Sequence, residues 1–96
     1  MSDFPFNETV IEENMKFIEV IREFSGKLSS EELNWHRDRE HRLVKILKGK
    51  GWYIQFENEL PVEMTENTSF YIKKNVWHRI INKNGNNLMI NVRKFK

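Results

Sequence analysis

The chain contains two short segments whose side chains could do chemistry. The first carries polar residues at every second position, namely His36, Asp38, Glu40 and Arg42, and the second contains His78. Residues two apart share one face of a β-strand. Because this row continues into the apolar residues Val44 and Ile46, we expect the face to point inward. Polar groups are costly there unless they pair with each other, with a metal or with a ligand.

The elements that position these residues follow from residue 31 onward. Short runs rich in Trp, Tyr, Phe, Val and Ile alternate with turn residues up to the end of the chain. This spacing is typical of a β-sandwich or a β-barrel. We expect a mostly β barrel over residues 31–96, with strands near residues 32–38, 41–48, 51–57, 61–63, 69–72, 77–82 and 87–94.

The first 30 residues show a different pattern. We expect residues 1–9 to form a loose arm. Apolar residues then recur at steps of three and four, at Ile11, Met15, Ile18, Ile21 and Phe24. This period predicts an N-terminal helix over residues 10–24 that packs on the barrel. The alternative for the same segment is a strand within residues 16–24.

Composition excludes several classes of protein. A chain of 96 residues is one domain, and the lack of cysteine excludes disulfides and thiolate metal sites. Sixteen Lys and Arg against 14 Asp and Glu are too balanced to indicate a nucleic acid partner. The N-terminus has no long apolar run, so we expect no membrane partner and a cytoplasmic protein. The bias toward Lys, Asn and Ile is typical of AT-rich genomes, including those of some phages.

The spacing of the polar residues resembles the two motifs of the cupin family. The family's first motif, G-x5-H-x-H-x3/4-E-x6-G, aligns with His36, Asp38, Arg42 and Gly49. Its second motif, G-x5-P-x-G-x2-H-x3-N, aligns with Asn67, Lys73, Asn75, His78 and Asn82. The resemblance covers roughly residues 32–92. It implies a small cupin-type antiparallel β-barrel, the double-stranded β-helix of RmlC-like proteins.

The departures from the first motif decide what kind of site the resemblance implies. Asp38 stands where the family has a second His, and Arg42 stands where it has a metal-binding Glu. The remaining set, His36, Asp38 and His78, is similar to the triad of two His and one carboxylate that leaves open positions on non-haem iron. The implied cofactor is a divalent metal, with Fe, Mn, Ni and Zn all suited to these ligands.

Arg42 and Glu40 are the candidate catalytic residues beside this metal set. Arg42 has no lone pair for a metal, but its guanidinium can bind the carboxylate or phosphate of a ligand in a two-pronged contact. One alternative is that Arg42 only balances the charge of Asp38 and meets no ligand. Another is that His36, Asp38 and Arg42 form a buried ion-paired network in a cupin that has lost its metal. Glu40 would act as a base or as an extra oxygen ligand. His41 falls on the opposite strand face, where we expect it to be exposed.

Two function hypotheses follow from the resemblance, and the sequence does not decide whether the chain is an enzyme. The first is a metal-dependent enzyme similar to the small dioxygenases, isomerases and lyases of the family. The second is a non-catalytic module, ligand-capturing or regulatory, that binds a small anionic molecule. Because cupin barrels pair through edge strands, we also expect a homodimer that buries some of Trp52, Tyr53, Phe70 and Tyr71.

Overall fold

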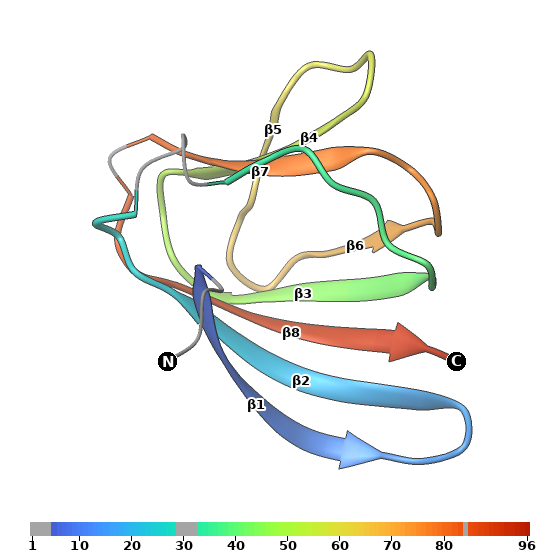
Figure 1. Cartoon of the computed structure of the whole chain (residues 1–96). Coiled ribbons are helices and arrows are strands. Elements are labelled where there is room, and N and C mark those ends of the chain that lie inside the picture. The colour runs from blue at the N-terminus through green and yellow to red at the C-terminus, as the bar shows by residue number, and fades with distance from the viewer. Residues whose placement is uncertain (1–4, 29–32, 84) are drawn as a thin grey trace.

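The computed structural model describes residues 5–28, 33–83 and 85–96, and within these ranges it contains strands and no helix (Figure 1). The strands are β1 (Phe6–Glu13), β2 (Phe17–Phe24), β3 (Arg42–Lys48), β4 (Trp52–Phe56), β5 (Val62–Glu63), β6 (Ser69–Ile72), β7 (His78–Asn82) and β8 (Leu88–Phe95). No helix that could span a membrane occurs in this part of the chain.

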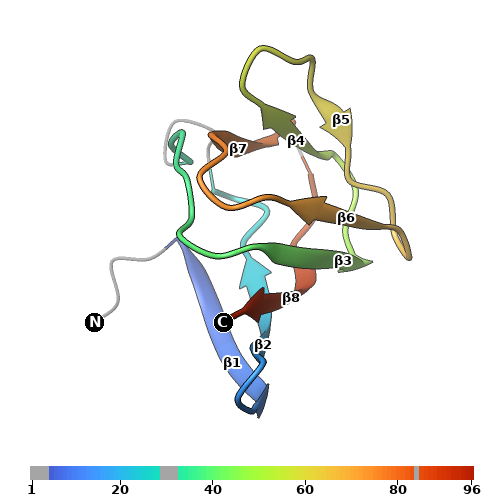
Figure 2. The same cartoon turned by 90° about the vertical axis from the view of Figure 1, so that its right-hand side faces the viewer.

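The strands form two antiparallel sheets that face each other. The larger sheet has the order β1-β2-β8-β3-β6, and the smaller one has the order β5-β4-β7. Figures 1 and 2 show the smaller sheet lying over β3, β6 and β8, while the β1–β2 hairpin extends away from it. The expected mostly β, antiparallel architecture is confirmed.

The core lies between the two sheets and is built by residues at alternate strand positions. On β3, Val44 and Ile46 are buried, while the neighbouring Leu43 and Lys45 are exposed. Alternation of this kind places one face of a strand against the opposite sheet. The other buried apolar side chains are Val20, Phe24, Leu33, Trp52, Ile54, Met64, Ile72, Leu88, Ile90 and Val92. The inward direction expected for the Val44 and Ile46 row is therefore confirmed.

The predicted helix over residues 10–24 is wrong, and the alternative strand is confirmed. The loose arm predicted over residues 1–9 is also wrong for residues 6–9, which belong to β1, while residues 1–4 lie outside the described residues. The side-chain oxygen of Asn14 accepts hydrogen bonds from the backbone nitrogens of Lys16 (2.8 Å) and Phe17 (3.0 Å). This turn reverses the chain, so β1 and β2 pair as an antiparallel hairpin. Val20 and Phe24 then lie on the same inward face of β2, a period of two that the apolar steps of three and four had obscured.

Of the predicted strands, only the one over residues 32–38 is wrong. Residue 32 lies outside the described residues, and residues 33–38 form one isolated bridge, between His36 and His78, rather than a strand. The segment from residue 33 to residue 41 is a loop that runs beside the start of β7. The other six predicted strands begin and end within one residue of the observed ones.

Candidate metal site

Backbone hydrogen bonds hold the loop that carries His36 and Asp38 against the start of β7. The backbone nitrogens of His36 and His78 each donate to the other residue's carbonyl, at 3.0 and 2.9 Å. Two residues further along, the nitrogen of Asn75 donates to the carbonyl of Asp38 at 2.7 Å. Asn75 has a φ of 63°, in the left-handed region that Asn tolerates better than most residues. A turn of the chain thus fixes the position of Asp38.

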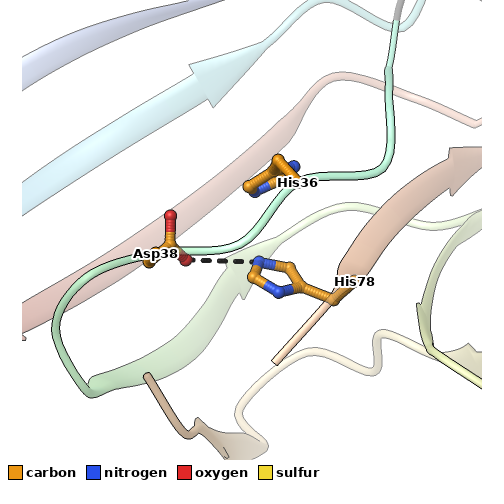
Figure 3. Close-up of side chains that lie close together, drawn as sticks. All are labelled: His36, Asp38 and His78. Atoms are coloured by element: carbon orange, nitrogen blue, oxygen red, sulfur yellow. Dashed lines mark ion pairs between the residues drawn. The ribbon is translucent and has the colours of Figure 1, made fainter. Parts of the chain in front are cut away.

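The three predicted metal ligands converge, as Figure 3 shows. His36, Asp38 and His78 each offer a ligand atom, and these atoms all lie within 4.8 Å of one another. The two imidazole rings approach edge to face, with their centroids 4.3 Å apart. His78 is only 3% exposed, whereas His36 is the solvent-exposed member. The cluster therefore lies between the buried interior and the surface.

Both imidazoles have the same hydrogen-bond arrangement. Nδ1 of His36 lies 3.0 Å from the carbonyl oxygen of Asn34, and Nδ1 of His78 lies 2.9 Å from that of Val76. A carbonyl oxygen only accepts, so Nδ1 must carry the proton in each ring. In the neutral form, each Nε2 then presents a lone pair. This is the tautomer that a metal-binding His adopts when a backbone carbonyl orients it.

The carboxylate of Asp38 has one paired and one unpaired oxygen. Its Oδ1 lies 3.2 Å from Nη2 of Arg42. Its Oδ2 is buried without a hydrogen-bond partner in the described structure, although it lies 3.3 Å from Nε2 of His78. A buried oxygen without a donor costs free energy. A cation between Oδ2 and the Nε2 lone pair would remove this cost, so the three residues fit a divalent metal.

The charge states of the cluster suit metal binding. Although His36 as a residue is exposed, its ring packs against the ring of His78, and this partial burial lowers the pKa of the imidazole, with His78 acting in the same direction. Burial alone would raise the pKa of Asp38, but the hydrogen bond that a protonated His78 would donate and the positive charge of Arg42 outweigh it and hold that pKa below its ordinary value. At neutral pH, His36 is therefore neutral and Asp38 is ionised. A metal requires both of these states.

The site opens into a cavity of about 410 Å³ between the two sheets. His36, Asp38, His78 and Arg42 contribute to its wall. Most of the remaining wall is apolar, with Phe24, Val44, Ile54, Met64, Phe70, Ile72, Ile80, Ile90 and Val92 among its residues. A largely apolar cavity with a few convergent polar groups is typical of small-molecule binding sites.

Arg42 and Glu40 lie beside the cluster and are paired with each other. Nε and Nη2 of Arg42 donate to Oε1 of Glu40 at 2.9 and 2.7 Å, and Nη2 also reaches Asp38. Arg42 contributes to the cavity wall, whereas Glu40 does not. The geometry therefore supports Arg42 as the charge partner of Asp38. The catalytic roles predicted for Glu40 and Arg42 stay predictions.

His41 and Arg22 lie near the site, and the sequence predictions for both were incomplete. His41 is not in the cluster, but it is half-buried rather than fully exposed. Its Nδ1 accepts a hydrogen bond from the backbone nitrogen of Lys74, and its ring stacks on Tyr71. Sequence reasoning missed Arg22, which lines the cavity from β2. Its signal was the alternation of Val20, Arg22 and Phe24, which a helical interpretation conceals.

Comparison with solved structures identifies the fold of the chain. No protein-family model and no curated protein matches the chain. Solved structures do match. An RmlC-like cupin family protein with a double-stranded β-helix fold from Methanocaldococcus jannaschii superposes with a TM-score of 0.76 at 18% identity, over 94% of this chain and 79% of that one. The chain has the cupin fold.

Two other matches extend the comparison. A cupin domain from Bordetella pertussis gives a TM-score of 0.72 at 16% identity, over 100% of this chain and 98% of that one. A structure from a study of the DMSP lyases RdDddP and RnDddQII gives a TM-score of 0.72 at 11% identity, over 86% of this chain and 40% of that one. Cupin-fold proteins similar to this chain thus include one of its own size and one from a study of lyases.

The cupin fold explains two substitutions in the second motif. Asn67 and Asn75 stand where the cupin motif has Gly, and their φ angles are 66° and 63°. Both positions need the left-handed conformation that Gly adopts freely and Asn tolerates. The motif's Asn is Asn82, whose side-chain nitrogen donates to the carbonyls of Gly26 (3.0 Å) and Leu28 (2.7 Å). Asn82 therefore has a structural role, which is to fix the segment after β2 to the end of β7.

Proposed function

We propose that this cupin binds a divalent metal at His36, Asp38 and His78 and a small anionic molecule in the adjoining cavity. The observation that carries the proposal is the contact between Asp38 and His78. The lone pair of a neutral His78 Nε2 and an unpaired carboxylate oxygen lie 3.3 Å apart in a buried place. Two acceptors so close repel each other unless a proton or a cation lies between them.

Three protein ligands would leave open positions on the metal. When bound, the metal would act as a Lewis acid on an oxygen of the substrate. The residues of the chain would do the rest. The Nδ1–H groups of His36 and His78 donate to backbone carbonyls, which keeps both imidazoles oriented. Arg42 holds the carboxylate of Asp38 in place. Fe, Mn, Ni and Zn all accept imidazole and carboxylate ligands, so the donor set does not distinguish among them.

The charges that line the cavity support a small anionic ligand. Arg22 and Arg42 contribute two positive charges to the wall, and Asp38 is its only carboxylate among the described residues. A bound divalent metal would add further positive charge. The mostly apolar wall strengthens these interactions, because charges attract more strongly where water is excluded.

Whether the metal performs a reaction divides the two candidate functions. The fold of this chain is shared with a structure from a study of DMSP lyases, which supports the first candidate, an enzyme, and among its reaction types a lyase. The position of Glu40 favours the second candidate, a binding module without turnover. The carboxylate of Glu40 is engaged by Arg42 and lies outside the cavity wall, so it is not placed to take a proton from a ligand.

Metal analysis tests the proposal directly. The protein is purified without chelator or histidine tag, its metal content is measured, and the metal-free protein is titrated with Zn²⁺, Mn²⁺, Ni²⁺ and anaerobic Fe²⁺. We expect one site per chain for at least one of these ions, with a rise in melting temperature. A metal-free preparation that none of the four ions stabilises would remove the metal from the proposal and leave the binding module.

A further inference from the structure

Arg22 reaches the cavity from the inward face of β2, in the row that includes Val20 and Phe24. Its Nε donates to Oε1 of Glu8 on the neighbouring strand at 2.6 Å. Its guanidinium lies over the ring of Phe6, 4.1 Å from the ring centroid. These two contacts hold the plane of the guanidinium at the cavity wall.

The two terminal nitrogens of Arg22 have no such partner. Apart from the contact with Glu8, the guanidinium makes no hydrogen bond or ion pair to any residue in the described part of the chain. The side chain is nevertheless only 13% exposed. The terminal nitrogens are not fully enclosed, because Asp38 Oδ2 is the only fully buried side-chain nitrogen or oxygen of the described residues that lacks a partner. Arg22 therefore presents two parallel donors that an acceptor from outside the chain can satisfy.

Arg42, the other guanidinium of the cavity wall, differs in this respect. Carboxylates of Glu40 and Asp38 occupy its Nε and Nη2. A ligand anion near Arg42 would compete with both of these carboxylates. Arg22 has one internal carboxylate and keeps its terminal fork open, so it is the better anion-binding group.

The surroundings of Arg22 indicate what the rest of the ligand is. Phe24, Ile54, Met64, Ile80 and Ile90 line the same cavity of about 410 Å³. An apolar body loses little by entering such a space and gains the hydrophobic free energy of burial. A planar carboxylate matches the two parallel donors of a guanidinium. A phosphate dianion carries more charge than a carboxylate, so its desolvation in a mostly apolar cavity costs more.

We propose that Arg22 binds the carboxylate of a small, largely apolar organic acid whose body fills the cavity beside His36, Asp38 and His78. This assignment deepens the proposed function and rests on its claim that the cavity binds an anion. It does not rest on the metal, because Arg22 is not one of the proposed ligands.

Arg93 provides a matched control on the opposite face of the same sheet. Its Nε donates to Oε1 of Glu19 at 2.8 Å, and its guanidinium lies over the ring of Phe17, 4.2 Å from the centroid. These contacts repeat those of Arg22 with Glu8 and Phe6. Arg93 does not line the cavity. Loss of Arg93 therefore reproduces the loss of an ion pair and a ring contact without touching the proposed site.

The experiment titrates benzoate and its neutral counterpart benzamide, by calorimetry, into the wild type and into Arg22→Gln, Arg22→Lys and Arg93→Gln. Each protein is measured with and without saturating Zn²⁺, and its melting temperature is recorded. We expect benzoate to bind the wild type more tightly than benzamide. Arg22→Gln should weaken benzoate binding by about tenfold or more, and Arg22→Lys by less. Arg93→Gln should bind benzoate as the wild type does.

Several outcomes would overturn the assignment. They are a wild type that binds benzoate neither with nor without Zn²⁺, equal affinity for benzoate and benzamide, and a folded Arg22→Gln with wild-type affinity. If Arg22→Gln does not fold, the Arg22→Lys variant decides, because a lysine can still pair with Glu8. Wild-type affinity of Arg22→Lys for benzoate would then reject the proposal. Arg22-dependent binding in a protein that takes up no metal would uphold the assignment and reject only the metal site. Normal metal uptake together with benzoate binding that does not depend on Arg22 would uphold the metal site and reject the assignment of Arg22.

Discussion

Nε2 of His78 and Oδ2 of Asp38 lie 3.3 Å apart in the interior of the protein, and neither atom has a hydrogen-bonding proton to offer while the imidazole is neutral. The carbonyl of Val76 fixes this situation by occupying the single proton of the ring. The chain thus holds two acceptors face to face where water has little access. Either a bound metal or a second proton on His78 would remove this repulsion. Removal of His78 tests the metal.

The first prediction concerns removal of His78. His78→Ala should lower the affinity for the bound metal by about a hundredfold or more, since loss of a group that merely orients a ligand already costs about 10–100-fold. Calorimetric titration of metal-free protein measures the effect, and circular dichroism checks the fold. His41→Ala is the control, because His41 lies outside the cavity. Equal metal affinity in the His78 variant and the wild type would contradict the metal site.

The second prediction concerns acid stability. Burial opposes ionisation of Glu8, but its contacts with Arg22 and Lys94 outweigh burial and lower its pKa below the ordinary value of 4.5. A carboxyl with a lowered pKa in the folded state contributes stability above its unfolded pKa and loses that contribution as the pH falls through the folded value. The wild type should therefore lose stability below about pH 4.5 partly through Glu8.

Glu8→Gln tests this prediction within one pair of proteins. The variant should melt at a lower temperature than the wild type at pH 7, because it lacks the ionised partner of Arg22. The difference should shrink as the pH falls below about 4.5, because the wild-type carboxyl then gains a proton and resembles the amide. A difference in melting temperature that stays constant from pH 7 to pH 3 would show that the ionisation of Glu8 does not contribute.

How much of the fold the sequence predicts depends on how each segment is stabilised. Strands such as β3 alternate buried and exposed side chains, and glycines mark the turn that follows, with Gly51 at a φ of 80°. Both signals are local, so they can be read from the sequence. The segment over residues 10–24 misled because Ile18, Ile21 and Phe24 fit a helical period, whereas the inward row of β2 includes a charged residue, Arg22. The side chain of Asn14, which forms the turn, decides between the two.

The candidate site divides in the same way. His36, Asp38 and His78 were predictable because their spacing resembles a motif that the fold keeps in place. The role of Arg22 was not, since its position at the cavity depends on the pairing of β2 with β8, residues that are far apart in the sequence. The pairing of Arg42 with Glu40 depends on side-chain geometry in a loop, which strand periodicity does not describe.

The third prediction concerns association, for which the homodimer stays a prediction. Of the four residues named for the interface, Trp52 is fully buried in the core of its own chain and has no surface to offer a partner. The edge strand β1 is the better candidate. Val10 and Ile11 are 56% and 51% exposed, and an exposed edge with apolar side chains readily pairs with another chain. We expect a dimer in which β1 of one copy lies against the same strand of the other.

Light scattering at micromolar concentration tests the dimer. Ile11→Lys should shift the mass toward that of a monomer, because a charge would have to be buried between the copies. Met15→Lys is the control, since Met15 is exposed in the turn after β1 and outside the strand. A wild type that remains monomeric would contradict the prediction. A dimer unaffected by Ile11→Lys would place the interface elsewhere.

The last prediction concerns the pairing of Asp38 with Arg42. The side chains of these residues are 8% and 13% exposed, and their charged groups lie 3.2 Å apart. Removing one partner of a buried pair leaves an uncompensated charge, so Arg42→Ala should lower the free energy of unfolding of the metal-free protein by about 3 kcal/mol. The double variant Asp38→Asn with Arg42→Ala should recover more than half of that loss, because neither charge remains. Arg93→Ala should cost only about 0–1 kcal/mol, since its pair with Glu19 lies nearer the surface. Urea denaturation of five proteins measures these differences: the wild type, Arg42→Ala, Asp38→Asn, the double variant and Arg93→Ala. A double variant that is as unstable as the sum of its single changes would show that Arg42 does not act as the charge partner of Asp38, and Arg42 would then be the second residue to test for binding of the anion.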